Sequence, residues 1–546
     1  MRNIYICIIL ITLYFNPAFK VFAQTYRLLE SSSTLKGPKH EILPRPNGDI
    51  LTITHPNTGD KGPMTVSRFD DQLNEIYTRR ITLLSHECYQ AAWYDNDRLF
   101  LFCTDKLGGL TRYEIDENTG SLTGQPAPLT GLLGIVSHPK NAAFLTGNSP
   151  DGAFHYIVSS MEGKHSAEKT IRGLILNRHG EKTALFQYAI PATTSSADLA
   201  THADRGVSRP LDLLFVQGSP RSIDLSFVQG VDGTLSMIYG SAANYTLVRI
   251  GIDGKPNAFP LSGLPDGNFR YVSWVAEGET LRFSGLLSRT RKTNFTAIVT
   301  GSVDLTTGTV FNLRQTEVAT LMAQAPPALR DRVQNGFPAD LTLLRTLTLS
   351  DASRVVLFES SGQHLYQNHF SPATQNPISA FGRSGTFTSS SPSTEGIRYQ
   401  SRGDVYVLKL DRDNVPQWLN VLSKNQEASE KTTAIGIGCL ADQQDNLHIF
   451  FYDSKYNADA YAANPTPVRT DDPRGNEFAC ISITPDGAMK KQFIPITDQH
   501  YRLMPELAFV DNKNEACFLA VKTKMSITEQ LASDNNGYKL GTIAVK

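Results

Sequence analysis

The sequence predicts an all-β fold, a β-propeller with eight blades or, as the alternative, seven. Three observations support this prediction: a repeated four-strand unit, recurrent Asp/Asn/Gly turns, and several strands that are apolar along their whole length. A run that is apolar on both faces is typical of a strand covered by sheets on both sides. Four short antiparallel strands, repeated about eight times in units of about 40–80 residues, indicate a propeller.

Each unit begins with an apolar strand, a turn of Asp, Asn and Gly, and a second strand. These first turns lie at residues 45–49, 94–98, 148–152, 229–233, 276–280, 349–353, 442–446 and 510–514. After a connection of variable length come a third strand, a second turn and a fourth strand. The second turns lie at residues 70–74, 116–120, 253–255, 304–308, 411–414 and 485–487. Asp, Asn and Gly suit these turns because they tolerate left-handed backbone or bond to their own backbone.

The number of blades depends on residues 191–222. There the segment LDLLFVQG (211–218) is echoed by IDLSFVQG (223–230). The first copy is either an extra strand or part of a loop, and this leaves seven blades as the alternative. A β-sandwich array is the other fold that short antiparallel strands allow.

The two chain ends are expected to close the ring together. The last unit supplies three strands, at about 507–510, 516–521 and 538–545, whereas the strand at 25–30 belongs to no unit. We expect this N-terminal strand to complete the last blade as its outer member. Such a clasp removes an open sheet edge, which would otherwise template aggregation.

Residues 1–23 are typical of a secretory signal peptide. Arg2 precedes an apolar run at 4–15, and the segment ends in a small-residue cleavage pattern at 21–23. An uncleaved anchor is the alternative, although the run is shorter than the ~20 residues that cross a bilayer. We therefore expect residues 24–546 to be one exported propeller domain, periplasmic or extracellular, with no transmembrane segment after cleavage.

The charge balance gives no sign of nucleic-acid binding. Lys and Arg together number 52 and Asp and Glu 53, so the formal net charge is −1. A nucleic-acid-binding domain is usually strongly basic. The chain also lacks the Gly-x-Ser-x-Gly, His-Glu-x-x-His and phosphate-loop patterns of familiar catalytic and nucleotide sites. We expect a monomer without a cofactor or a metal.

Cys88 and Cys103 flank the turn at 95–97, and a hairpin centred on this turn would place them opposite each other. Export would permit a cross-strand disulfide between them. The alternative is two buried thiols, since cysteine often serves as a small core residue.

The segment RGDVYVLKLDRDNVPQWLNVL (402–422) contains three apparent motifs that we interpret as one structural unit. Its Arg-Gly-Asp tripeptide starts a third strand, Asp411 and Asp413 lie in the second turn, and Trp418 lies in the fourth strand, where we expect it to pack between blades. A calcium loop would need Gly at its sixth position and Glu at its twelfth, and neither is present.

This segment resembles the degenerate repeat of secreted bacterial β-propeller proteins, which runs strand, VxKLDxxGxxxW, strand. Residues 64–81 and 479–496 are similar in rhythm. The resemblance covers most of residues 25–546 and implies the propeller fold. It leaves function open, because such propellers include scaffolds, binding proteins and enzymes.

Loop length points to one side of the ring. The connections between second and third strands are short in the first five units and long in the last three, at about 361–401, 453–476 and 522–537. These loops belong to adjacent blades and are expected to form a wall on one face, and long loops in compact domains are often functional. Two further insertions are expected near 191–210 and 316–337, the latter with short helices interrupted by Pro326-Pro327.

The long loops combine aromatic rings with carboxylates and arginines, a mixture that suits recognition of a sugar or a peptide. The function favoured by the sequence is therefore that of an exported, non-catalytic propeller that binds a glycan, peptide or protein partner. The alternative is a polysaccharide hydrolase or lyase. The candidate binding residues are His364, Tyr366, His369, Tyr452, Asp453, Tyr456, Asp459, Tyr461, Arg469, Asp471, Asp472 and Arg474.

Overall fold

The structure is a computed structural model, and most of the repeated units lie within the residues that it describes. The predicted signal peptide (1–23) and the predicted insertion near 191–210, apart from residue 191, lie outside them. The described residues are 26–28, 39–45, 48–55, 64–84, 87–95, 98–105, 109–129, 144–149, 151–162, 169–191, 224–241, 244–289, 294–324, 327, 330, 333, 335–338, 341–366, 397–429, 436–457, 468–469, 476–496, 501–510, 515–522 and 538–544.

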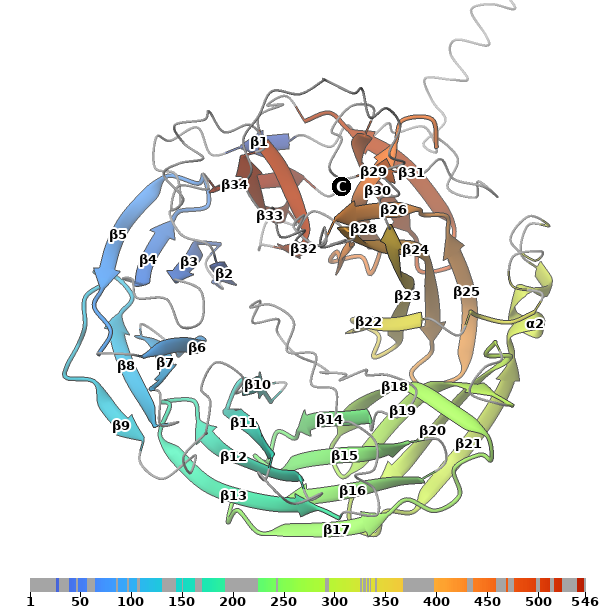
Figure 1. Ribbon diagram of the computed structural model, residues 1–546, viewed down its shortest axis with the longest axis horizontal. Helices are drawn as coiled ribbons and strands as arrows, with labels where there is room; N and C mark the ends of the chain where they lie inside the picture. Colours follow the sequence, from blue (N-terminus) through green and yellow to red (C-terminus); the bar gives the residue numbers. More distant parts are fainter. Residues whose placement is uncertain are drawn as a thin grey trace, which may run out of the picture.

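The sheets are arranged in a ring around a common centre (Figure 1). Within the described residues, seven sheets have four antiparallel strands each and one sheet is larger. The predicted β-propeller with four-stranded antiparallel blades is therefore confirmed. No helix of the described residues is both long and apolar enough to cross a membrane.

Five blades of four strands come first in the chain. The first two are β2 (Lys39–Pro44), β3 (Ile50–His55), β4 (Met64–Phe69) and β5 (Glu75–Ile81), then β6 (Cys88–Asp95), β7 (Arg98–Thr104), β8 (Leu110–Asp116) and β9 (Ala127–Leu129). The next three are β10 (Phe144–Asn148), β11 (Phe154–Glu162), β12 (Lys169–Asn177) and β13 (Lys182–Ile190), then β14 (Asp224–Gln229), β15 (Leu235–Ser241), β16 (Asn244–Ile250) and β17 (Pro256–Pro260), then β18 (Asn268–Glu277), β19 (Thr280–Ser288), β20 (Ala297–Asp304) and β21 (Val310–Glu317).

A short helical segment, α2 (Val318–Leu321) and η4 (Met322–Gln324), follows the fifth blade, inside the region where the sequence predicts helices. The large sheet comes next and contains β22 (Leu341–Thr348), β23 (Arg354–Tyr366), β24 (Ile397–Leu410), β25 (Pro416–Leu422), β26 (Gln426–Ser429) and β29 (Val468–Arg469). Two blades complete the ring: β27 (Gly438–Ala441), β28 (Leu447–Ser454), β30 (Asn476–Ile483) and β31 (Met489–Ile494), then β32 (Tyr501–Val510), β33 (Glu515–Lys522), β34 (Tyr538–Ala544) and β1 (Tyr26–Leu28).

Strand β1 closes the ring as the sequence predicts. It pairs antiparallel with β34, with Tyr26 opposite Ile543 and Leu28 opposite Gly541. The first strand of the first blade, β2, contacts β32 of the last blade. The last sheet thus combines strands from both ends of the chain, and Figure 1 shows β1 beside β34.

The core lies between successive blades. One buried cluster, for example, joins Leu51 and Ile53 of β3 to Leu99 and Leu101 of β7. Every residue of β3 is buried, because neighbouring sheets cover both of its faces. This packing explains why several second strands, such as β7 over Leu99–Cys103, are continuously apolar rather than alternating.

In several blades the turn between the third and fourth strands contacts the preceding blade. Gly120 and Gly254 have positive φ angles of 70° and 76°. A Cβ on Gly120 would lie 2.5 Å from the Tyr77 ring, and one on Gly254 would lie 2.3 Å from the Leu185 carbonyl oxygen. Glycine is needed here for both the left-handed backbone and the close approach.

In the large sheet, Asn414 occupies the corresponding turn with φ of 65°. Its Nδ2 donates to the carbonyl oxygens of Phe283 at 2.8 Å and Gly301 at 3.1 Å, both in the preceding blade. Asparagine tolerates left-handed backbone better than most residues. Asn414 thus replaces the glycine of the repeat and adds hydrogen bonds between blades.

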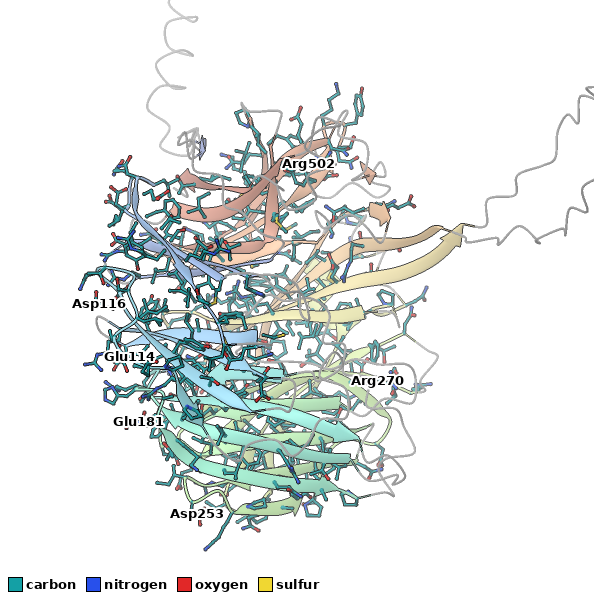
Figure 2. All side chains as sticks on the ribbon, turned by 60° about the vertical axis from the view of Figure 1, so that its left-hand side comes forward. Glu114, Asp116, Glu181, Asp253, Arg270 and Arg502 are labelled. Atoms are coloured by element: carbon teal, nitrogen blue, oxygen red, sulfur yellow. The ribbon has the colours of Figure 1, made fainter. Side chains whose placement is uncertain are left out.

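The large sheet continues beyond the ring. We call the part formed by residues 361–366, 397–402, 426–429 and 468–469 the projecting sheet. Figure 2 shows its long yellow and tan strands leaving the ring on one side, whereas Asp116 and Asp253, in two of the third-to-fourth-strand turns, mark the opposite face. The sequence predicts a loop at 361–401, and this boundary is wrong: β23 runs to Tyr366 and β24 begins at Ile397.

The structural interpretation of the Arg-Gly-Asp tripeptide is confirmed, although the strand begins earlier than predicted. Gly403 lies within β24, and a Cβ there would be 2.2 Å from Ser360 Oγ. Trp418 packs against the next blade as predicted, since its Nε1 donates to the Pro485 carbonyl oxygen at 3.1 Å.

The predicted register of the β6–β7 hairpin is wrong by one residue. Cys88 lies opposite Thr104 and Cys103 lies opposite Tyr89, and the pairing is irregular between Tyr89 and Ala91. Adjacent positions on a strand point to opposite faces, so this shift separates the two cysteine side chains. Both cysteines are free thiols, and burial raises the pKa of Cys103 well above its usual value.

Candidate functional site

The candidate functional site is the projecting sheet, whose base lies where strand β24 changes its partner. Val405 pairs with Leu422 of β25, whereas Arg402 pairs with Gln426 of β26. Between these pairs, the Lys424 backbone N–H donates to Asp404 Oδ1 at 3.2 Å. The site therefore gathers residues from β24, from the segment after β25, and from the facing strand β23.

A buried ion pair lies at the centre of this base. Lys424 Nζ donates to Glu359 Oε1 and, at 3.0 Å, to Gln426 Oε1. The Lys424 and Glu359 side chains are 0% and 1% exposed, respectively. Arg402 Nη1 contacts the second carboxylate oxygen of Glu359 at 3.2 Å. Removal of one partner from such a pair leaves an uncompensated buried charge, which is strongly destabilising.

Gln426 connects this ion pair to the following blade. Its Nε2 donates to the Tyr452 carbonyl oxygen at 2.7 Å, and its Oε1 accepts from the Gly436 backbone N–H at 3.1 Å. Since Tyr452 lies in β28, Gln426 links the projecting sheet both to the ion pair in the large sheet and to the β27–β31 blade.

A second buried ion pair lies at the end of β28. Asp453 Oδ2 accepts from Lys491 Nζ at 2.6 Å, and its Oδ1 accepts from Asn457 Nδ2 at 2.7 Å. Lys491 also lies 5.5 Å from the ring centroid of Phe493. These contacts hold the start of the 455–475 connection on the ring.

Strand β29, which comes from that connection, pairs in parallel with β26, with Arg469 opposite Glu427. Segments from the large sheet and from the β27–β31 blade therefore meet in the projecting sheet. This agrees with the predicted proximity of the long loops in adjacent blades.

Two of the predicted binding residues are buried and hydrogen-bonded. Tyr452 is 4% exposed and Asp453 is 0% exposed. The Tyr452 hydroxyl accepts from the Leu503 backbone N–H at 2.8 Å, and burial raises the pKa of this hydroxyl. Tyr456, by contrast, is 76% exposed. Tyr452 and Asp453 thus position the strand end, whereas the Tyr456 side chain is exposed to solvent.

The role of the other predicted residues stays a prediction. His364 and Tyr366 lie in β23 and Arg469 lies in β29, but their side chains are outside the description. The remaining predicted residues lie outside the described part of the chain: His369, Asp459, Tyr461, Asp471, Asp472 and Arg474.

The residues that anchor the projecting sheet were not predicted from the sequence. Glu359 directly follows the apolar run VVLF (355–358), and Lys424 follows WLNVL after one serine. A charged residue directly after an apolar strand is the signal that could have identified them. Their partnership could not be inferred, because 64 residues separate them and no local pattern links their positions.

A hydrogen-bonded row of Asp442, His448 and Ser482 lies elsewhere in the β27–β31 blade. His448 Nε2 and Nδ1 lie 3.0 Å from Asp442 Oδ2 and Ser482 Oγ, respectively. His448 is 2% exposed. Burial raises the pKa of Asp442, but hydrogen bonds from His448 and Asn446 outweigh it and leave this pKa below its usual value. The buried imidazole makes this row a structural link.

The described part of the chain contains no group of three or more His, Cys, Asp or Glu side chains arranged to hold a metal ion.

Comparisons with known proteins give similarity in fold only. No family model matches the chain, and no curated protein matches it. Similar solved structures include a prolyl endopeptidase, with 9% identity, a TM-score of 0.37 and coverage of 89% of this chain. They also include a polysaccharide lyase, with 7% identity, a TM-score of 0.35 and coverage of 85% of this chain and 90% of the lyase.

A GH43 β-1,3-galactosidase is similar at 9% identity and a TM-score of 0.26, with 61% of this chain and 93% of the galactosidase covered. The chain spans 55% of the length of the prolyl endopeptidase. At these identities and TM-scores, the similarities carry no conclusion about activity.

Proposed function

We propose that this protein is an exported, non-catalytic β-propeller that binds a glycan, peptide or protein partner through the projecting sheet and the segments at its tip. The observation that supports this role is the length of β23 and β24. They contain 13 and 14 residues and are the longest strands in the described part of the chain. They carry the sheet beyond the ring, where a partner has access to it (Figure 2).

The anchoring of the projecting sheet supports a binding role. A binding surface is most effective when buried contacts hold it in one conformation before the ligand arrives. Glu359, Lys424 and Gln426 supply such contacts, and they join the projecting sheet to β28. A sheet fixed in this way presents its tip at low entropic cost.

We further propose that the large sheet counts as a blade, which gives the ring eight blades in all. We also propose that residues 24–546 form one domain. Strands β22, β23, β24 and β25 pair in chain order, as the strands of the other blades do. Strands β26 and β29 are then additions to this blade in the projecting sheet.

Export is proposed from the predicted signal peptide at 1–23. The expected result is that the secreted product of a bacterial host begins at Gln24, as read by N-terminal mass spectrometry. A chain that stays in the cytoplasm with Met1 intact would contradict export.

The binding proposal can be tested by removal of the tip. Tyr366 and Ile397 are paired across β23 and β24, so a two-residue Asn-Gly turn can replace residues 367–396 and still fit the hairpin. The matched control replaces residues 163–168 by the same turn, because Glu162 and Lys169 are paired across β11 and β12.

Binding of the wild type and both variants would be measured on glycan and peptide arrays and by capture of envelope proteins with a photo-crosslinker at Tyr456. We expect the tip variant to lose the wild-type ligand and the control variant to retain it, with both folded. Equal binding by the tip variant would overturn the proposed surface. Turnover of labelled polysaccharides by the wild type would instead show an enzyme.

A further inference from the structure

Arg354 is a buried guanidinium at the joint between the β18–β21 blade and the large sheet. It opens β23 and is 1% exposed. Its Nη2 donates to Asn414 Oδ1, and Asn414 in turn bonds to the carbonyl oxygens of Phe283 and Gly301. The Nε and Nη1 donors of Arg354 are buried and have no hydrogen-bond partner among the described residues.

The charges around Arg354 do not compensate it. The neighbouring cation is Arg282, and the neighbouring acid is Glu277. Glu277 already forms an ion pair with Arg282 at 2.6 Å, and Arg282 also donates to the Arg412 carbonyl oxygen. Two guanidinium groups therefore share one carboxylate, and that carboxylate contacts Arg282.

Arg354 cannot remove its buried positive charge by losing a proton. Burial and Arg282 lower the pKa of Arg354 to about 10, which still leaves it charged at neutral pH. A buried charge without a partner lowers the free energy of unfolding by roughly several kcal/mol, and each unpaired buried donor lowers it further. The described residues therefore leave Nε and Nη1 of Arg354 without an acceptor and its charge without a carboxylate of its own.

We propose that a monovalent anion of the size of chloride binds at this joint, held by Nε and Nη1 of Arg354. Such an ion supplies both the missing acceptor and the missing negative charge. Water would satisfy the two donors but would leave the charge uncompensated. The bound anion would stabilise the contact between the two blades, because Arg354 and Asn414 both lie at that contact.

The first test compares melting temperatures in sodium chloride and in sodium gluconate at equal ionic strength. An anion that binds the folded state at about 100 times its Kd raises the melting temperature of a chain this long by about 2 °C. We expect this chloride-dependent increase in the wild type and its loss in Arg354→Met. Arg68→Met is the matched control, since Arg68 donates to Asp49 at 2.8 Å and has its own acidic partner; it should keep the increase.

The second test does not depend on the folding of a variant. Wild-type crystals grown in sodium bromide would be measured at the bromine absorption edge. An anomalous peak in contact with Nε and Nη1 of Arg354 is expected. A water at that position without an anomalous signal, or an equal chloride effect in Arg354→Met, would overturn the proposal.

Discussion

Asn414 shows how one side chain can take over the role of a glycine and extend it. Several other third-to-fourth-strand turns use glycine for close approach, as at Gly120 and Gly254. Asn414 keeps the left-handed backbone and inserts its amide between two carbonyl groups of the preceding blade. The sequence predicts the turn, because its residue types are local, but it does not predict the inter-blade bonds, which depend on residues more than 100 positions away.

The Asn414 contacts predict graded losses of stability. Asn414→Gly keeps the backbone conformation and loses the side-chain bonds, so the free energy of unfolding should fall by about 1–3 kcal/mol. Asn414→Ala should lose about 1 kcal/mol more, because alanine is disfavoured in left-handed backbone. Asp413→Ala, at the exposed neighbouring position, is the control and should change stability by less than about 0.5 kcal/mol. Urea unfolding gives these values, and a fully stable Asn414→Gly variant would refute the role.

His155 makes stability depend on pH. Its ring stacks on Trp93 with centroids 4.0 Å apart, and burial lowers the pKa of His155 to about 4. In the unfolded chain this pKa returns to about 6.5. Between these values the unfolded chain binds a proton that the folded chain does not, so stability falls as pH falls from about 6.5 toward 4.

Lowering the pH from 7 to 5 should therefore cost about 2 kcal/mol through His155 alone. His155→Phe keeps an aromatic ring against Trp93 and has no titrating group. The difference between the unfolding free energies at pH 7 and pH 5 should be smaller by about this amount in the variant. An unchanged difference would show that His155 is not buried in the neutral form.

At the scale of the element, strand β24 belongs to two pairings at once. Its lower half completes an ordinary blade with β25, and its upper half pairs with β26 in the projecting sheet. The turns and strands of this unit were predictable because residue type and alternation are local signals. The change of partner was not, because it depends on β26 and β29, which come from connections that look like loops in the sequence.

The buried pair at the base of the projecting sheet predicts strong coupling between two residues. Glu359→Leu and Lys424→Met should each lower the free energy of unfolding by about 3–5 kcal/mol, because each removes the buried opposite charge from the partner that remains. The double variant removes both charges and should recover most of this loss. Urea unfolding of all four proteins measures the coupling energy.

Arg402→Met serves as the control for this cycle. The Arg402 side chain is 26% exposed, so its contribution should be only about 0–1 kcal/mol. Additive losses in the double variant would contradict the proposed anchoring pair.

At the scale of the whole molecule, stability depends on the three-residue strand β1. It covers the edge of β34, which would otherwise expose unpaired backbone groups. Removal of residues 24–30 should lower the melting temperature and increase association at high concentration, as seen by light scattering. A synthetic peptide of residues 24–30 should reverse both effects, whereas a scrambled peptide should not. A truncated protein that remains monomeric at the wild-type melting temperature would contradict this role.

The overall architecture was the most predictable level. The repeat places its strands in order, and the unused strand at the N-terminus identified the closure in which Tyr26 faces Ile543. The register of single hairpins was less predictable, since one extra residue in β6 separates Cys88 from Cys103 without a visible signal in the sequence. Of the candidate site, the sequence indicated the region of Tyr452 and Tyr456 but not the buried charges beneath it.

The pairing of β1 with β34 also constrains when the molecule can become complete. A ribosome makes Tyr26 more than 500 residues before Ile543, so their contact joins positions that are far apart in the sequence. Contacts between distant residues form slowly, because a long loop must close first. The last blade therefore cannot be completed before β34 has been made, and pairing of β34 with β1 is expected to be a late step of folding. Until that step β34 presents an unpaired strand edge, to which a second chain could add.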